Sequence, residues 1–154
     1  MAGERKKKNV NLDTLGLEMG NRPPQALDVE EAVLGALLIE PNCIDEAMDE
    51  LTPNCFYSEK HRMIFDAMRS LSNEHVPLDL LSVSQKLKTN GNLEIVGGSV
   101  ALAQLSQKIG AAAHIDYYIR ILKQKCIQRE LITASYEILK SSYDESVNVD
   151  ELID

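Results

Sequence analysis

The sequence has no tryptophan and only two Phe and five Tyr, so it offers few rings on which nucleic-acid bases could stack. No apolar run approaches the roughly 20 residues that are needed to cross a bilayer. The basic start, Met1–Val10, is not followed by an apolar segment, which excludes a secretory signal peptide. The three cysteines, Cys43, Cys55 and Cys126, are odd in number and widely spaced, so they predict no disulfide framework and favour a reducing cytosol.

Sequence motifs for catalysis and for ligand binding are also missing. There is no G-x-x-x-x-G-K-[ST] phosphate loop, and no G-x-G-x-x-G, G-x-S-x-G, H-E-x-x-H, C-x-x-C or EF-hand pattern. Cys55 and His61 are near neighbours, but a packed thiol beside a surface histidine is favoured over a metal site with two ligands. The acidic pairs at 30–31, 45–46 and 49–50 are interpreted as solvating charge on exposed helix faces. The sequence therefore predicts no catalytic residue, no cofactor-binding residue and no metal ligand in this chain.

Charge is unevenly distributed along the 154 residues. The net charge of −8 divides into +2 over residues 1–22 and −10 over residues 23–154. An acidic body repels a phosphate backbone, so it is a poor platform for nucleic acid. The run Arg5–Lys8 could contact DNA, RNA or an acidic partner, or it could be a solvated extension, which is the interpretation that we favour. We interpret residues 1–22 as a disordered basic leader that ends at Pro23-Pro24.

After the leader, the apolar spacing is helical throughout and predicts an all-α fold. The first predicted helix begins at Asp28 and ends before Pro41, and the next two cover residues 44–51 and 58–71. After a loop over 72–79, a fourth helix runs from its cap Asp79 to Asn90-Gly91. A fifth begins at Gly97-Gly98, and a sixth spans about 112–142. The predicted core of the head, residues 23–110, consists of Val33, Leu34, Leu37, Phe56, Ile64, Phe65, Met68, Leu71, Val83 and Leu87.

The first predicted helix carries two local signals. Asp28 followed by Glu31 resembles a capping box and predicts an N-terminus at Asp28. Ala32, Gly35 and Ala36 share one face, and the glycine weakens the helix by about 1 kcal/mol relative to alanine. Either another helix approaches closely at this face, or the glycine is a tolerated accident; the sequence leaves both open.

The long segment from Ala112 to about Ser142 contains neither Gly nor Pro and is apolar on two sides, so it must bury more than one face. Residues 148–154 look like the start of a second helix, with Asn148 as its cap, which predicts a hairpin arm over 111–154 whose second helix is truncated and a chain that is a fragment of a longer protein. The surface predicted for self-association or partner binding comprises Ile115, Tyr118, Ile119, Leu122, Leu131, Ile132, Tyr136 and Leu139.

Several strings, in their joint order, resemble the N-terminal domain of DnaB-type bacterial replicative helicases. The similarity covers roughly residues 23–154, and its parts are Pro23-Pro24-Gln25-Ala26, Glu30 to Leu38, Phe56-Tyr57, His61 to Phe65, Asp79-x-x-Ser82-Val83, Leu87, Gly97-Gly98 and Arg129-Glu130-Leu131-Ile132. The chain departs from the expected pattern at Val100-Ala101, where aromatic residues are expected, and at His114, where an asparagine is expected. The capping role of that asparagine is therefore not carried over to His114.

The resemblance implies a small helical head followed by a helical hairpin, and a scaffold role in DNA replication. In that family the domain forms a collar on a hexameric ring as a trimer of dimers. Primase docks on this domain, which also contributes to contacts with the helicase loader. The implied parent protein is a cytoplasmic, nucleoid-associated, ATP-dependent DNA helicase of the primosome. Its ATP, its Mg²⁺ and most of its DNA contacts would belong to a RecA-like motor domain absent from this chain, and no membrane is involved.

A second hypothesis is a stand-alone helical adaptor that modulates a replication partner. The two hypotheses differ in whether a phosphate-loop motif follows codon 154 in the gene.

Overall fold

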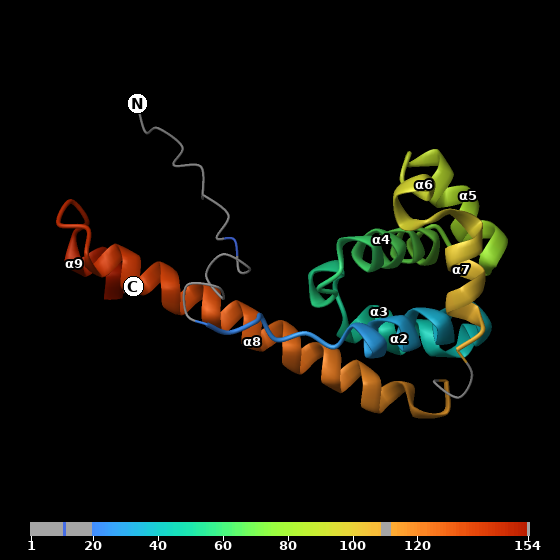
Figure 1. Cartoon of the computed structure of the whole chain (residues 1–154), viewed down its shortest axis with the longest axis horizontal. Helices are drawn as coiled ribbons and strands as arrows, with labels where there is room; N and C mark the ends of the chain where they lie inside the picture. The colour runs from blue at the N-terminus through green and yellow to red at the C-terminus, as the bar shows by residue number, and fades with distance from the viewer. Residues whose placement is uncertain (1–10, 12–19, 109–111, 154) are drawn as a thin grey trace. The chain divides into compact units, whose positions relative to one another are not determined.

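A computed structural model of the chain describes residue 11, residues 20–108 and residues 112–153. Every regular element in these ranges is helical, which confirms the predicted all-α class (Figure 1). Residues 1–10 and 12–19 of the predicted leader lie outside the described residues. No helix in the described ranges is both long and apolar enough to span a bilayer. The α-helices are α2 (Leu27–Ile39), α3 (Ile44–Glu50), α4 (Glu59–Asn73), α5 (Leu80–Thr89), α6 (Leu93–Val96), α7 (Gly98–Ser106), α8 (Ile115–Ser142) and α9 (Val149–Ile153), and the 3-10 turns are η1 (Pro41–Cys43), η2 (Pro53–Cys55) and η3 (Ala112–His114).

The chain divides into two compact units, and the boundary falls inside α8. The head comprises Gln25–Cys126, and the arm comprises Met1–Pro24 with Ile127–Asp154. The sequence-based division at residues 110 and 111 therefore differs from the division in the structure. The first part of α8 belongs to the head, and each unit is described below by itself.

The core of the head is formed by the predicted apolar residues and by the start of α8. All ten predicted core residues are at most 5% exposed. Phe56 and Phe65 pack with their ring centroids 4.8 Å apart, a spacing at which tilted aromatic rings attract. Ile115, Ile119 and Leu122 are buried in the same cluster. The apolar stripe at the start of α8 is thus buried by the head itself.

Gly35 lies where α2 approaches the end of α7. A Cβ atom added at Gly35 would stand 2.2 Å from the carbonyl oxygen of Leu105 and 3.1 Å from its carbonyl carbon. Backbone atoms cannot turn away as a flexible side chain can, so only glycine fits at this point. Ala36 beside it is buried and Ala32 is partly buried against the core. Of the two interpretations left open by the sequence, close approach is the one that the structure supports.

The helix ends show which local sequence signals predicted a helix terminus correctly. Asp79 caps α5 as predicted: its carboxylate accepts from the Ser82 amide at 2.7 Å, and the Ser82 hydroxyl accepts from the Asp79 amide at 2.9 Å. The predicted cap at Asp28 was wrong. The helix begins at Leu27, and the Ala26 carbonyl closes its first turn by accepting from the Glu30 amide at 3.0 Å. Asp28 lies inside that turn, where its negative charge interacts favourably with the helix dipole.

Two further boundaries differ from the predictions, and one agrees with them. The short helix α6 was not predicted; it ends at Val96, and Gly97, which has a φ of 106°, lies between α6 and α7. Helix α4 extends to Asn73, two residues beyond the predicted end. In the arm, the Asn148 side chain accepts from the Asp150 amide at 3.2 Å, so the predicted cap of the final helix is confirmed.

Candidate interaction surfaces

Glu30 is a buried carboxylate that fixes the entrance of α4. Its side chain is 1% exposed, and it accepts hydrogen bonds from the backbone amides of Tyr57 at 2.5 Å and Ser58 at 3.3 Å. Nδ1 of His61 lies 2.7 Å from its second oxygen. A buried charge is tolerated when such bonds replace its lost hydration. Glu30 therefore ties α2 to the turn before α4 and orients the His61 ring.

The expectation that the acidic pair at 30–31 lies on an exposed face was wrong for Glu30. The signal that could have revealed it is periodicity, because Val33, Leu34 and Leu37 follow Glu30 by three, four and seven residues. These spacings place all four on one helix face. An acid on an apolar stripe is a candidate for a buried, hydrogen-bonded role. Glu31, on the next position, is half-buried and pairs with Lys108.

The first half of the surface predicted for self-association lies within the head. Ile115, Ile119 and Leu122 are 5%, 2% and 1% exposed, and Tyr118 is half-buried against the same core. Apolar side chains that are already removed from water gain little from a second partner. These four residues therefore stabilise the head, and the eight predicted residues do not form one continuous surface.

The second half of that surface lies in the arm and is more accessible. Leu131 and Leu139 are 61% and 56% exposed, while Ile132 and Tyr136 are half-buried. Further exposed apolar side chains on the same stretch of α8 are those of Ile127, Ile138 and Tyr143. Exposed apolar residues gathered along one helix mark an interaction surface more often than scattered ones do.

Arg129 holds the start of the described chain against α8 within the arm. Its side chain is 6% exposed, and Nη1 donates to the carbonyl oxygen of Pro24 at 2.8 Å. Pro23 beside it is buried. The arginine of the Arg129-Glu130-Leu131-Ile132 string thus has a structural function, which is to fasten the Pro-Pro segment to the helix.

Two carboxyl groups meet at the junction of α3 and α8 in the head. The pKa of Glu46 is raised by a side-chain hydrogen bond with Asp116, by partial desolvation and by the negative charges of Asp116 and Glu50.

Burial, together with the charges of Glu40, Glu46 and Asp116, raises the pKa of the Cys43 thiol. Cys43 is therefore a packed, protonated thiol, which is the usual state of an inert structural cysteine.

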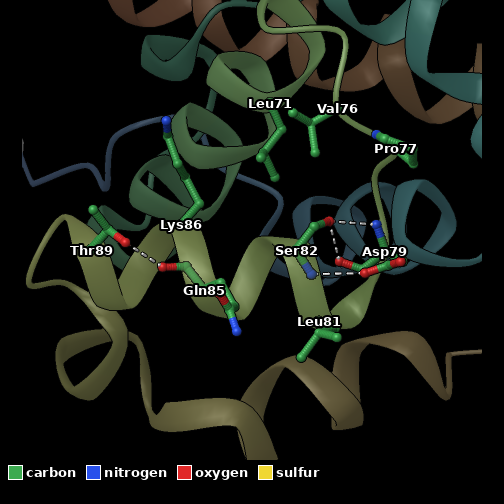
Figure 2. Close-up of a pocket in the computed structure, with 9 residues that line it drawn as sticks. All are labelled: Leu71, Val76, Pro77, Asp79, Leu81, Ser82, Gln85, Lys86 and Thr89. Atoms are coloured by element: carbon green, nitrogen blue, oxygen red, sulfur yellow. Dashed lines mark hydrogen bonds between the residues drawn. The ribbon is translucent and has the colours of Figure 1, made fainter.

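A groove of about 560 Å³ lies beside α5. Figure 2 shows the side chains that line it. Leu71, Val76, Pro77 and Leu81 give it an apolar side, and Leu81 is 69% exposed. Its polar groups are largely engaged with one another. The hydroxyl of Ser82 bonds to Asp79, the hydroxyl of Thr89 donates to the Gln85 carbonyl at 3.0 Å, and Lys86 pairs with Glu74 at 2.5 Å. Among the described residues, the charged side chains that line the groove are Asp79, which accepts from the Ser82 amide, and Lys86, which pairs with Glu74.

The described residues contain no group of three or more His, Cys, Asp or Glu side chains that could hold a metal ion. Cys55 is buried and lies 3.6 Å from the Thr52 hydroxyl, while His61 bonds to Glu30.

Comparisons with known proteins agree with this architecture. The family described as "DnaB-like helicase N terminal domain" matches residues 22–124. A replicative DNA helicase DnaB from Rhodothermus marinus is 36% identical over 145 residues, which are 94% of this chain and 15% of that protein. The replicative DNA helicase DnaB of Geobacillus stearothermophilus is 35% identical over 132 residues, which are 86% of this chain and 29% of that protein. The chain thus spans less than a third of the length of these relatives.

Among solved structures, the crystal structure of the N-terminal domain of DnaB helicase from Mycobacterium tuberculosis is similar to this chain, with a TM-score of 0.80 and 30% sequence identity. The match covers 86% of this chain and 93% of that one. Both the sequence match over most of the chain and the shared helical architecture lead to the same assignment. The chain belongs to the family of DnaB-like helicase N-terminal domains.

Proposed function

We propose that this chain is the scaffold and interaction domain of a bacterial replicative DNA helicase and that the arm mediates its self-association. The observation that carries the proposal is the contrast along α8. Four residues of one stripe, Ile115, Ile119, Leu122 and Cys126, are buried in the core, whereas Leu131 and Leu139 farther along the helix are more than half exposed. Where α8 continues beyond the core of the head, its exposed apolar side chains need a further surface to cover them. In this proposal the partner is a second copy, and copies assemble as dimers and then as the collar of a hexamer.

The proposal includes partners outside the chain. Primase and the helicase loader dock on the collar, so this domain acts in the primosome, in the cytoplasm at the nucleoid. ATP hydrolysis with Mg²⁺, DNA unwinding and most DNA contacts are assigned to a motor domain in the rest of a longer protein. The acidic composition of residues 23–154 supports protein partners over direct DNA binding by the head.

The self-association proposal is tested by sedimentation velocity over a concentration series. We expect the sedimentation coefficient of the wild-type chain to rise with concentration. Burying one leucine side chain contributes about 1.5–3 kcal/mol, so the double variant Leu131→Glu/Leu139→Glu should weaken association at least about 100-fold. The matched control is Leu81→Glu, because Leu81 is 69% exposed on α5 in the head. A wild-type chain that is monomeric at every concentration, or a double variant that associates like wild type, contradicts the proposal.

Primase docking requires a separate experiment. We expect a purified primase C-terminal domain to bind the 154-residue chain in a calorimetric titration, and crosslinking with mass spectrometry would map the contacts. Absence of binding by both the monomeric and the associated chain would remove primase from the proposal.

The adaptor hypothesis differs at the level of the gene. Sequencing beyond codon 154 should reveal a phosphate-loop motif in the same reading frame. A stop codon without such a motif would favour the adaptor.

A further inference from the structure

Beyond Cys126, helix α8 carries two apolar stripes that differ in how far they are covered. The first, which we call the anchor stripe, follows Arg129 at spacings of three and four residues, so its members share one face. It consists of Ile132, Tyr136, Leu139 and Tyr143. Ile132 and Tyr136 are half-buried, whereas Leu139 and Tyr143 are 56% and 81% exposed. The other stripe, formed by Ile127, Leu131, Ala134 and Ile138, is exposed throughout. The anchor stripe is thus covered near Arg129 and open at its far end.

Arg129 fixes the end of the basic leader beside the anchor stripe. Its guanidinium donates to the Pro24 carbonyl at 2.8 Å, and Pro23 is buried. In Figure 1, residues 20–24, drawn in blue, lie along α8 and run toward the end of the helix that leads to α9. Residues 12–19 therefore continue from a point beside the arm, on the side of α8 that Arg129 defines.

The leader and the arm carry the same order of apolar and charged residues, counted outward from this anchor. Residues 12–19, the nearer part of the leader, include four apolar side chains, which are Leu12, Leu15, Leu17 and Met19. Three of them, Leu12, Leu15 and Met19, are spaced by three and four residues, as the members of the anchor stripe are. Farther out, the run Arg5–Lys8 carries four positive charges, and residues 144–154 beyond α8 carry five acidic and no basic side chains. Each part of the leader thus has a complementary part of the arm at a similar place in the order.

The leader is also long enough to reach these residues. The α8 helix rises about 1.5 Å per residue, so its end at Ser142 lies about 20 Å from Arg129. An extended chain spans about 3.3 Å per residue, which lets Leu12 lie up to about 40 Å from Pro24. A tether of this kind keeps the leader at an effective concentration on the order of 1 mM beside the arm, so a contact of modest affinity is sufficient to hold it there.

We infer that the leader covers the arm of its own chain: residues 12–19 pack on the anchor stripe, and Arg5–Lys8 pair with the acidic residues beyond α8. The removal of Leu139 and Tyr143 from water drives the contact, and the opposite charges set its direction. This differs from the solvated extension that the sequence alone favours. The cover is a property of the single chain and does not depend on the self-association proposed above. Because the proposed dimer also uses Leu139, a second copy has to displace the leader at that residue.

Hydrogen–deuterium exchange at a protein concentration at which sedimentation shows a monomer tests the inference on the full chain. Leu15→Glu/Met19→Glu removes two apolar residues of the leader, and Thr14→Glu/Asn21→Glu makes the same charge change as the control. In the first variant, we expect amides of residues 132–143 to exchange at least about tenfold faster than in wild type. That factor corresponds to about 1.4 kcal/mol, less than the burial of one leucine contributes. Residues 115–126 should not change in either variant, and the control should match wild type.

Two neighbouring positions of α8 provide the reciprocal test. Leu139 and Ile138 are 56% and 60% exposed but lie on different stripes. Leu139→Glu should raise the exchange of leader amides 12–19 to the rate of a free peptide of residues 1–22, whereas Ile138→Glu should leave their protection as in wild type.

Three results would overturn the inference. The first is a wild-type leader that exchanges like the free peptide, which would make it a solvated extension. The second is an equal effect of the two α8 variants, or of the two leader variants. The third is leader protection that appears only as the protein concentration rises, which would place the leader on another copy.

Discussion

Gly35 provides a quantitative test of how α2 and α7 pack. In Gly35→Ala, the new Cβ would lie 2.2 Å from the Leu105 carbonyl oxygen, whereas unstrained contacts of carbon atoms begin near about 3.5 Å. The end of α7 or the α2 backbone must therefore move by about 1 Å. Overpacking of this kind costs about 1–3 kcal/mol, and the improved helix propensity of alanine returns about 1 kcal/mol.

The difference leaves about 0–2 kcal/mol of destabilisation. We expect the upper half of that range, about 1–2 kcal/mol, for Gly35→Ala, because a backbone carbonyl cannot rotate away from the new methyl group. For a chain of this length that loss corresponds to a fall in Tm of about 2–8 °C. Urea and thermal unfolding followed by circular dichroism would measure it. Hydrogen exchange should locate the extra opening in α7, and Gly35→Ser should be at least as unstable. A Gly35→Ala variant as stable as wild type, or more stable, would refute the close-approach argument.

Three further predictions concern the head and use the same unfolding measurements. Glu30→Ala should destabilise the domain by about 3 kcal/mol or more, because it leaves two backbone amides and His61 without their acceptor; a change below about 1 kcal/mol would contradict a buried role. Leu122→Glu places a charge at a position 1% exposed and should unfold the head, so an intact circular dichroism spectrum would contradict its assignment to the core. Glu46→Gln should stabilise the domain more at pH 7 than at pH 4. The folded-state pKa of Glu46 is raised, so its favourable contribution is present at low pH and is lost as the pH rises through that pKa. An equal effect of Glu46→Gln at both pH values would exclude the carboxyl repulsion.

Local sequence signals predicted the elements that depend on neighbouring residues. Apolar periodicity located α2, α4, α5 and α8, and the predicted caps at Asp79 and at Asn148 were both correct. Gly35 was recognised as unusual, but its meaning depends on Leu105, which is 70 residues away in the chain. The short helix α6 lacked enough residues to show a period.

Interactions between distant segments explain what the sequence did not predict. Glu30 bonds to Tyr57 and His61, which are about 30 residues away in the chain, and no local pattern near Glu30 predicts those partners. The two apolar stripes of α8 were visible in the sequence, but which stripe the head buries depends on how α8 meets the rest of the core. The predicted interaction surface was therefore too long at its N-terminal end, with Ile115, Ile119 and Leu122 as core residues.

In the proposed assembly, α8 packs in the head as far as Cys126 and against a second copy beyond it. Hydrogen–deuterium exchange of the wild-type chain at a low and a high protein concentration separates the two parts of the helix, because exchange reports the protection of each stretch. We expect the amides of residues 115–126 to be protected equally at both concentrations, whereas those of residues 127–142 should gain protection as the concentration rises. Concentration-dependent protection of residues 115–126, or none for residues 127–142, would contradict it.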